Sequence, residues 1–440
     1  MLRKATANEE RMPPFSRQIK PIFLILGGLA LSIAGVRAAP PGQPPRVFFG
    51  QHLLYNQTFQ GLPPGLFDGL RIWGAEGSTW AEIEKRQGVY DFRLLDLHVA
   101  AAEARKLSLM HTLGQTPRWA SARPDEKGNT GMGAAAEPAD LKDWARYVRE
   151  IATRYRGRIS AYEVMNEPRI PEAVKPWSPG FFSGSAATLA EMTRIAAFEV
   201  KKADPHAKIV CPAMDGAAGL RRLDHFLGIG GGKHCDVIGF HYYLEHHSID
   251  ELKYLIRETR RIQEHHGYAH LPIWNTETGL LIADAGYGLQ PRHTSGPLGK
   301  MFGSAEAIRL AARMLVVSTM LGVERTYWFA HDSSWMGSTL PDKRLNQLNA
   351  FGKSLAVLKT WLGGRTLRNC RDTGSEVLCE VVDGQRKAGA IYWGRGKAVA
   401  EWRESGYTQA ETLAGRSLIL GQLEPAAVFP SIADEPVFLH

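Results

Sequence analysis

Short apolar runs alternate with amphipathic stretches from residue 45 onward. The apolar runs are rich in Val, Ile, Phe and Tyr and have no polar face, which predicts strands buried on both sides. Eight such runs occur, at residues 46–51, 69–73, 107–114, 159–167, 207–214, 236–243, 272–277 and 325–330. Helical periodicity follows at residues 96–106, 141–155, 189–203, 249–266, 305–321 and 346–362. This repeat of strand and helix predicts a parallel sheet covered by helices.

The number of repeats favours an α/β fold of the (β/α)8 TIM barrel type over residues 45–362. Its span of about 320 residues fits the usual range of roughly 200 to more than 400 residues. The alternative is a doubly wound open sheet, which would need a Gly-rich turn after its first strand. Residues 48–56, "FFGQHLLYN", contain no such turn.

The pattern changes after residue 362. Segments 376–384, 388–396 and 398–405 alternate polar and apolar positions with turns between them and no helical period. We therefore expect residues 363–440 to form a small antiparallel, β-sandwich-like accessory domain without helices.

The first 38 residues resemble a targeting segment. Basic residues precede the apolar run 21–36, and the small residues Val36 and Ala38 suit cleavage by signal peptidase. An uncleaved membrane anchor is the alternative, although the run is slightly short of the roughly 20 residues that a spanning helix needs. Both interpretations predict export to the periplasm or the outside of the cell, and the second predicts membrane association through residues 21–36.

Composition narrows the function classes. The chain is 44% hydrophobic, 22% charged and 9% aromatic, which is typical of a globular protein. Residues 1–38 hold six Lys or Arg and two Asp or Glu, so the remainder has 47 basic and 43 acidic residues, a net charge of +4 rather than +8. No basic stripe with interleaved aromatic residues is present, so we expect no nucleic-acid partner.

The four cysteines give two expectations. Cys370 and Cys379 lie in a strand–turn–strand pattern and could pair across a hairpin in an oxidising compartment. Cys211 ends one predicted strand and Cys235 begins the next, which would place them at opposite ends of parallel neighbours. We expect these two to remain free.

Two predicted strands end in carboxylates. "YEVMNEP" (162–168) ends the fourth strand with Asn166 and Glu167, and "LPIWNTETGL" (271–280) ends the seventh with Glu277. Taken alone, Glu167 could be a capping acid. However, strands four and seven lie across the mouth of a barrel, where two inward carboxylates can face each other at about 5 Å, as double-displacement glycoside hydrolysis requires.

These motifs resemble those of glycoside hydrolase clan A, the retaining (β/α)8 enzymes. Asn-Glu-Pro at the end of strand four and "WNTETG" on strand seven carry the resemblance, and residues 71–121 are similar to glycoside hydrolase family 39. The resemblance covers residues 45–362, and a terminal β domain is also usual in that family. It implies an O-glycosyl hydrolase that needs no cofactor.

The resemblance also implies roles for individual residues. Glu167 would be the acid/base, Glu277 the nucleophile, and Asn166 a ligand of the sugar 2-hydroxyl. Arg71 would keep the nucleophile ionised. The remaining substrate-binding candidates are His241 and Tyr243 on strand six, and Trp328 on strand eight, where Tyr327 is the alternative.

Further residues near strand ends are candidates of a weaker kind. His52, Trp73, His111 and Trp119 could line a cleft, although packing explains each of them equally well. Glu163 precedes Glu167 by four residues, which predicts a deeper, structural acid paired with Arg71.

Two other motifs are set aside. "GIGGGKHC" (228–235) lacks the Gly-Lys-Ser/Thr of a phosphate loop. The histidines of "EHHGYAH" (264–270) lack an acid or Cys at ligand spacing, so we expect no metal.

The sequence therefore predicts an exported retaining glycoside hydrolase that acts on a polysaccharide or oligosaccharide. Long loops after strands three, four and seven favour internal cleavage of a chain, with an exo-acting pocket as the alternative. Two rival hypotheses are a non-catalytic carbohydrate-binding or polysaccharide-assembly protein on the same fold, and a membrane-anchored scaffold. The presence of both acids argues against the first rival.

Overall fold

A computed structural model describes residues 44–53, 64–173, 180–282, 300–330, 341–342, 347–394, 399–424 and 435–440. Its larger sheet is parallel, with the strand order β5-β4-β3-β2-β1-β11-β8-β7-β6. The strands are β1 (Phe49–Leu53), β2 (Gly69–Ile72), β3 (Ser108–Leu113), β4 (Ala161–Val164), β5 (Lys208–Val210), β6 (Met214–Asp215), β7 (Ile238–His241), β8 (Ile273–Thr278) and β11 (Val323–Trp328).

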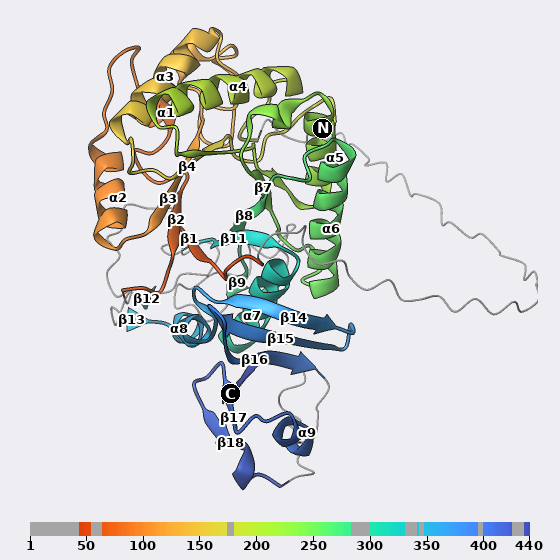
Figure 1. Cartoon of the computed structure of the whole chain (residues 1–440). Coiled ribbons are helices and arrows are strands. Elements are labelled where there is room, and N and C mark those ends of the chain that lie inside the picture. The colour runs from red at the N-terminus through yellow and green to blue at the C-terminus, as the bar shows by residue number, and fades with distance from the viewer. Residues whose placement is uncertain are drawn as a thin grey trace, which may run out of the picture. The chain divides into compact units, whose positions relative to one another are not determined.

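The strands labelled in Figure 1 curve round from β4 through β1 and β11 to β7. The sheet closes on itself because its two edge strands, β5 and β6, are pieces of one barrel strand. β5 pairs with β4 and β6 pairs with β7. The isolated parallel bridges Asn166–Ala213 and Val210–Val237 complete the seam. The described residues therefore form the predicted (β/α)8 barrel, in which residues 208–215 supply the interrupted fifth strand.

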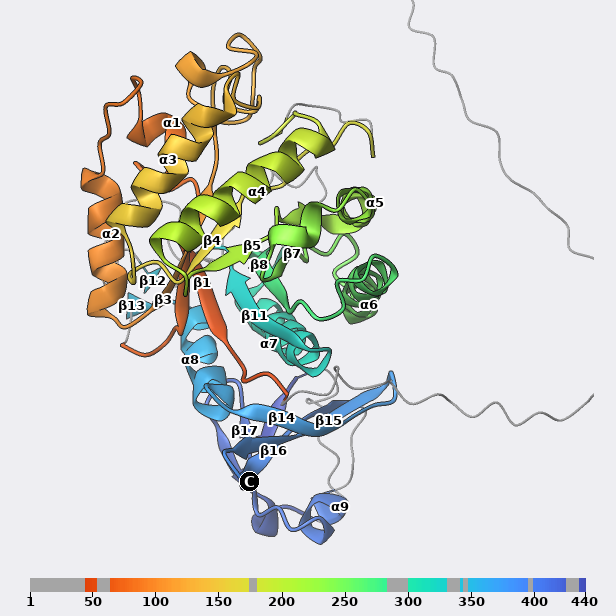
Figure 2. The same ribbon diagram turned by 45° about the horizontal axis from the view of Figure 1, so that its top comes forward.

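Helices lie around the outside of these strands (Figure 2). They are α1 (Trp80–Ile83), α2 (Arg93–Ala104), α3 (Leu141–Arg154), α4 (Ala186–Ala203), α5 (Gly216–Gly228), α6 (Ile249–His265), α7 (Ser304–Met320) and α8 (Ala350–Leu362). Side chains of Asp140, Ser185, Ser248 and Asn349 cap four of them by accepting backbone N–H bonds. Short 3₁₀ turns cover Arg118–Ala120 and Gly231–His234. We did not predict α5, since its first turn contains Gly and Ala in place of an apolar stripe.

Apolar side chains fill the barrel below its C-terminal end. Met110 and Ala161 pack there with Val210, Val237, Trp274 and Tyr327. Gly50 makes room for this layer, because a Cβ at that position would lie 2.6 Å from the Tyr327 ring. Met110 and Ala161 each lie two residues before a polar inward residue, Thr112 and Glu163. The polar side chains of the interior are thus gathered at the C-terminal end of the strands.

The second sheet is antiparallel, with the order β14-β15-β16-β19-β17-β18. Its strands are β14 (Thr366–Asp372), β15 (Glu376–Asp383), β16 (Arg386–Gly394), β17 (Gln409–Thr412), β18 (Ser417–Ile419) and β19 (Val437–Leu439), and a 3₁₀ turn covers Leu420–Gln422. The expectation of no helix is wrong, because α9 (Val399–Glu404) forms from part of segment 398–405. That helix is too short to show a helical period, and it buries Trp402. The domain boundaries stay a prediction.

Contacts join this sheet to the barrel within one compact unit, residues 38–440. Lys253 of α6 forms an ion pair with Asp372 at 2.5 Å. Trp361 of α8 stacks on Phe438 at 5.8 Å between ring centroids and donates to Glu411. Two small pairs, β9 (Leu281–Ile282) with β10 (Met301–Phe302) and β12 (Pro341–Asp342) with β13 (Gln347–Leu348), complete the strands of the described ranges.

Both expected cysteine arrangements can be compared with the structure. Cys370 and Cys379 form a disulfide, as their hairpin spacing allowed. The expectation that Cys211 and Cys235 remain free is wrong, because they also form a disulfide. The fifth and sixth barrel strands are staggered, so that Val210 pairs with Val237 and the middle of one strand lies beside the start of the next.

None of the helices in the described ranges is long and apolar enough to cross a membrane. The predicted targeting segment, residues 1–38 with its apolar run 21–36, lies outside the described residues.

Candidate active site

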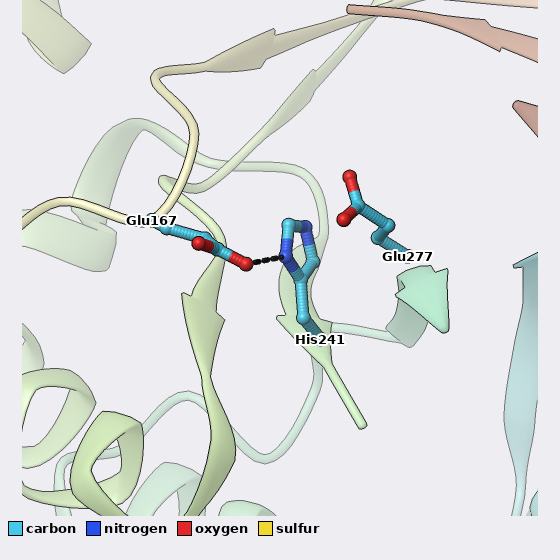
Figure 3. A group of neighbouring side chains, drawn as sticks. All are labelled: Glu167, His241 and Glu277. Carbon is cyan, nitrogen blue, oxygen red and sulfur yellow. Dashed lines mark hydrogen bonds and ion pairs between the residues drawn. The ribbon is translucent and has the colours of Figure 1, made fainter. Parts of the chain in front are cut away.

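Glu167 and Glu277 face each other across His241 at the C-terminal end of the barrel (Figure 3). One carboxylate oxygen of each acid and one ring nitrogen of His241 all lie within 4.8 Å of one another. His241 Nδ1 is 2.9 Å from Glu167 Oε1. The two predicted strand ends therefore do meet at one mouth.

The segment that carries Glu167 leaves the strand by an unusual route. Met165 and Glu167 both have positive φ, 70° and 40°, which is rare for residues with a side chain. Backbone hydrogen bonds hold them there, from Met165 N to Leu113 O on one side and from Glu167 N to Ala213 O on the other. Strained backbone of this kind persists only where its surroundings fix it. The result is that Glu167 is held above the end of β4 and between its two neighbours.

Glu277 reaches the mouth through a β-bulge. His241 pairs with Glu277 and Phe240 with Asn275, so β8 has one extra residue at this point. Strict alternation would place Trp274 and Glu277 on opposite faces, because they are three residues apart. The bulge reverses the alternation, so that Trp274 fills the barrel and Glu277 also points inward.

Donors surround Glu277. Arg71 Nη1 donates to Glu277 Oε2 at 2.6 Å, and the Tyr243 hydroxyl donates to Oε1 at 2.9 Å. His52 Nδ1 lies 3.5 Å from Oε2. Burial raises the pKa of Glu277 above its ordinary value, while the neighbouring His241 imidazole, the charge of Arg71 and the hydrogen bond from Tyr243 act in the opposite direction.

Arg71 connects Glu277 to the rest of the site. Its Nε and Nη2 donate to Glu163 Oε2 at 3.0 and 2.5 Å, and Nη2 also donates to Asn166 Oδ1 at 2.7 Å. Burial alone would lower the pKa of Arg71, but Glu163 and Glu277 raise it above its ordinary value. Burial would likewise raise the pKa of Glu163, which the charge of Arg71 holds below its ordinary value. Glu163 is thus the buried partner of Arg71 that the sequence suggested.

The surroundings of Glu167 are different. Burial raises the pKa of Glu167 to about 8, and the negative charge of Asp215 adds to that increase. Arg169, Arg222 and Arg71 act in the opposite direction. Burial also lowers the pKa of its hydrogen-bond partner His241, so that the imidazole is neutral near pH 7.

Asp215, at the end of β6, is tied to the segment that carries Glu167. Arg222 Nη2 donates to Asp215 Oδ1 at 2.7 Å, and Arg169 Nη1 donates to the same oxygen at 3.1 Å. Arg222 Nη1 also donates to the carbonyl oxygen of Pro168 at 2.7 Å. Since Pro168 and Arg169 directly follow Glu167, this arrangement fixes the position of the acid.

The triad of Glu167, His241 and Glu277 also presents three potential metal-ligand atoms. Arg71 already supplies a positive charge 2.6 Å from Glu277, which opposes the binding of a second cation at the same oxygens. We assign no metal to this cluster.

Comparison with known proteins places this fold in a wider group. A family model for glycosyl hydrolase family 10 matches residues 75–211. A family 39 glycoside hydrolase from Bacteroides cellulosilyticus WH2 is similar in structure, with a TM-score of 0.65 at 14% identity over 90% of this chain and 81% of that chain. The chain has the fold of the clan A glycoside hydrolases. The barrel predicted from the sequence is therefore confirmed, and the matched family model agrees with the resemblance found in the sequence.

Two further structures share the clan A fold. A family 39 enzyme from Xanthomonas axonopodis pv. citri gives a TM-score of 0.53 at 17% identity, covering 80% of this chain and 74% of that one. A monomeric β-xylosidase from Caulobacter crescentus CB15 gives 0.52 at 16% identity, covering 80% and 78%. No curated protein sequence matches this chain significantly. The family model and the fold together support hydrolysis of glycosidic bonds.

Other residues proposed from the sequence lie away from Glu167 and Glu277. His111 is on the outer face of β3, in edge contact with Tyr162 at 6.5 Å, because its neighbours Met110 and Thr112 take the inward positions. Trp119 is part of the loop after β3, where its Nε1 donates to the carbonyl oxygen of Glu84. The expectation that His111 lines the cleft is therefore wrong.

Trp328 also faces outward. Its ring stacks on Phe351 of α8 at 5.6 Å, and its neighbour Tyr327 fills the barrel. The next inward aromatic residue is Phe329, whose ring meets His52 edge-on at 4.7 Å and packs in one cluster with Tyr243. Alternation along β11 thus puts Phe329, which the sequence reasoning missed, beside the acid pair in place of Trp328.

His52 and Trp73 meet at the ends of β1 and β2. His52 Nε2 is 2.9 Å from the Trp73 carbonyl oxygen, and the Trp73 ring meets Phe181 edge-on at 5.7 Å. His52 also contacts Arg71 Nη1 at 3.1 Å, so it belongs to the surroundings of Glu277. Asp215 was not proposed from the sequence, although an acid directly after the apolar end of a predicted strand could have indicated it. Parts of the loops after β4 and β8, residues 174–179 and 283–299, lie outside the described residues.

Proposed function

We propose that the protein is a retaining O-glycosyl hydrolase that uses Glu277 as the nucleophile and Glu167 as the acid/base. The observation that carries the proposal is the short separation of two carboxylates in unlike surroundings, with oxygens within 4.8 Å of each other. Retaining enzymes hold their carboxyl groups about 5–5.5 Å apart, whereas inverting enzymes leave roughly 6.5–9.5 Å for a water molecule.

The two surroundings suit the two roles. Glu277 accepts from Arg71 and Tyr243, which favours the ionised form that a nucleophile needs. Glu167, with its pKa raised to about 8, is protonated at neutral pH and can donate to a leaving oxygen. Asn166 Oδ1 accepts a hydrogen bond from Arg71, which leaves the amide NH2 group of Asn166 for a sugar hydroxyl.

The reaction then has two displacements. Glu277 attacks the anomeric carbon while the C–O bond to the leaving group breaks, and the Glu167 proton passes to the departing oxygen. This gives a glycosyl ester on Glu277. In the second step Glu167, now ionised, takes a proton from water, whose oxygen displaces the ester carboxylate. The sugar leaves with its original anomeric configuration, and both acids return to their starting states.

We further propose that the substrate is a poly- or oligosaccharide encountered outside the cytoplasm. Export and membrane attachment rest on residues 21–36 of the sequence. One similar structure is described as a β-xylosidase, so aryl β-xylosides are a rational first substrate. Internal cleavage is proposed over exo action because of the long loops after strands three, four and seven. Release of single sugars alone from a labelled oligosaccharide would contradict it.

The two roles can be tested separately with a panel of aryl glycosides. Glu277→Gly should lose hydrolysis and regain turnover with azide, giving a glycosyl azide of inverted configuration. Glu167→Gly should keep activity on substrates with good leaving groups and, with azide, give the azide of retained configuration. Glu103→Gln, in an exposed ion pair on α2, is the control and should keep wild-type activity.

Three outcomes would oppose the proposal. NMR detection of an inverted hydrolysis product in the wild-type reaction would contradict the retaining mechanism. Full activity of Glu277→Gly would exclude Glu277 as the nucleophile. Sugar binding without turnover on every glycoside would favour the non-catalytic carbohydrate-binding protein.

A further inference from the structure

A cavity of about 590 Å³ lies in the loop that follows β3. One wall is formed by α1 and the turn after it, and the rest by residues 116–134. Lys85, Pro117, Arg118, Trp119 and Met132 are among the residues that line it. The volume falls within the range of roughly 300–1,000 Å³ that is usual for small-molecule sites.

The cavity opens at the same end of the barrel as the acid pair. Thr116 lies three residues beyond the end of β3, and β3 is the direct neighbour of β4, which carries Glu167. Met165 N donates to Leu113 O at 3.0 Å, so the ends of these two strands are held together. A glycan bound across the mouth on the β3 side would therefore pass over this loop.

The walls of the cavity are fixed by hydrogen bonds. Trp80 N donates to Gly114 O and Ala81 N to Gln115 O, both at 3.0 Å, which ties α1 to the loop. Thr116 Oγ1 donates to the Ala136 carbonyl at 2.6 Å. A site whose shape exists before binding loses less conformational entropy when a ligand enters.

Trp119 provides an oriented aromatic surface. Its Nε1 donates to the Glu84 carbonyl at 2.7 Å, and its ring meets Trp80 edge-on at 6.2 Å. The Arg146 guanidinium lies 5.9 Å from the ring centroid. The hydrogen bond, the Trp80 ring and the Arg146 guanidinium, which lies over one face of the indole, hold Trp119 in place, and the side chain still lines the cavity. Aromatic faces of this kind bind the apolar C–H faces of sugar rings.

The charged side chains that line the cavity are cations. Lys85 and Arg118 line the cavity, and among the residues that the structure describes no Asp or Glu does so. Lys85 forms no ion pair with any residue in the described ranges. Arg118 pairs with Asp125 at 2.6 Å, but both side chains are largely exposed, so a ligand carboxylate can compete for the arginine. The lining therefore favours a ligand with an apolar face and a negative charge.

We propose that this cavity is an accessory subsite for an acidic sugar, a uronate unit of the glycan, which stacks on Trp119 and pairs its carboxylate with Lys85 and Arg118. This inference rests on the proposed function, because it names the class of glycan that the acid pair would cleave. It assigns an anionic poly- or oligosaccharide as the substrate class.

Binding without turnover tests the proposal. The full chain with Glu277→Gln is titrated by calorimetry with hexamers of galacturonate, of mannuronate and of hyaluronan, each beside its carboxyl-reduced, neutral counterpart. At least one uronate hexamer should bind about tenfold more tightly than its neutral counterpart, the difference expected of one charge-assisted contact of about 1.4 kcal/mol. The preference should decrease at high salt.

Matched variants locate the preference. Lys85→Glu should abolish it, whereas Arg86→Glu, an exposed change of the same charge at a residue that does not line the cavity, should keep it. Trp119→Ala should weaken binding of both the charged and the neutral hexamer. Equal binding of every matched pair, or the same result for Lys85→Glu and Arg86→Glu, would overturn the proposal.

Activity separates this inference from the proposed function. Lys85→Glu should leave hydrolysis of a small aryl glycoside unchanged, since that substrate does not reach the cavity. Hydrolysis without a charge preference would refute the subsite alone. A charge preference located at Lys85 in a protein that hydrolyses no glycoside would refute the proposed function alone.

Discussion

Glu167 and Glu277 are the same type of residue within 4.8 Å of each other, yet their surroundings differ. Glu277 has a guanidinium at 2.6 Å and a phenol at 2.9 Å as donors. Glu167 has beside it the His241 imidazole, whose pKa is lowered by burial. The second carboxylate near it, Asp215, adds to the increase that burial causes in the pKa of Glu167. The difference teaches that the unlike electrostatic surroundings of the pair come from the neighbouring strands and not from the acids themselves.

The neighbours come from different parts of the barrel. Glu277 on β8 receives Arg71 from β2 and Tyr243 from the segment after β7. Glu167 is placed by the arginine–aspartate arrangement that begins at the end of β6. Arg71 and His241 act on both acids. However, Tyr243 donates to Glu277 and Asp215 raises the pKa of Glu167, so each acid has a neighbour through which it can be perturbed.

The largest expected effect comes from Arg71→Met. This change removes the cation beside Glu277 and also leaves Glu163 as an unpaired buried charge. Breaking a buried ion pair by removing one partner costs about 3–5 kcal/mol, so the free energy of unfolding should fall by about that amount, with loss of hydrolysis. Chemical denaturation followed by fluorescence measures the first effect, and aryl glycoside kinetics the second.

The double variant Arg71→Met/Glu163→Gln is the control. It should recover part of the lost stability, since the buried charge at position 163 is gone, but not the activity. If the double variant were as unstable as the single one, the unpaired charge of Glu163 would not be the cause of the lost stability. The description of Arg71 as a partner shared by Glu163 and Glu277 would then be wrong.

A smaller effect is expected from Tyr243→Phe, which removes a neutral donor to Glu277 and keeps the ring. A hydrogen bond to a charged group contributes about 1.5–3 kcal/mol, so kcat/KM should fall by roughly tenfold to a hundredfold. The hydrogen bond from Tyr243 lowers the pKa of Glu277. Its loss should therefore raise that pKa and move the acidic limb of the pH–rate profile to higher pH.

Tyr242→Phe provides the matched comparison. Tyr242 is buried and adjacent in sequence, but its ring stacks on Phe240 at 4.9 Å, away from the acids. Its variant should keep the wild-type acidic limb. An unmoved limb in Tyr243→Phe would show that the phenol does not act on Glu277.

The sequence predicts this pair well because a strand end is a local signal. A buried apolar run followed by Asn166, Glu167 and Pro168 indicates where a strand stops, and the eight-fold repeat indicates which strands face each other. The ion pair of Arg71 with Glu163 could also be predicted from the sequence. Period-two alternation places Glu163 on the same strand face as Glu167, four residues earlier.

Alternation also explains most of the errors. His111 and Trp328 lie on the predicted strands but on the outer face. The sequence shows that alternate residues point inward, but it does not show which alternate set does so until one inward residue is known. The bulge in β8 shifts the alternation between Trp274 and Glu277, so that both point inward. No residue type in that strand indicates a bulge. The Cys211–Cys235 disulfide depends on the stagger between neighbouring strands, which is a property of barrel closure and not of either strand.

The smallest effect, and the most specific, is expected from Asp215→Asn. Glu167 has to be protonated to act as the acid, so activity falls as pH rises through its pKa, near pH 8 in the wild type. The negative charge of Asp215 raises that pKa, and the amide would leave Arg169 and Arg222 uncompensated. Both changes favour the ionised form of Glu167. The alkaline limb of kcat/KM should therefore move to lower pH, while the acidic limb, which reports Glu277, stays in place.

Asp224→Asn is the matched control for this last prediction. Asp224 is an acid of α5, the helix that follows Asp215, but it is exposed and pairs with His266 at 2.8 Å, away from the mouth. It should leave both limbs unchanged. A general loss of stability in Asp215→Asn would lower activity at every pH without moving the alkaline limb, so the position of that limb separates an electrostatic role from a merely structural one. Movement of both limbs together would mean that the two acids share one set of neighbours, and the contrast between them would then fail.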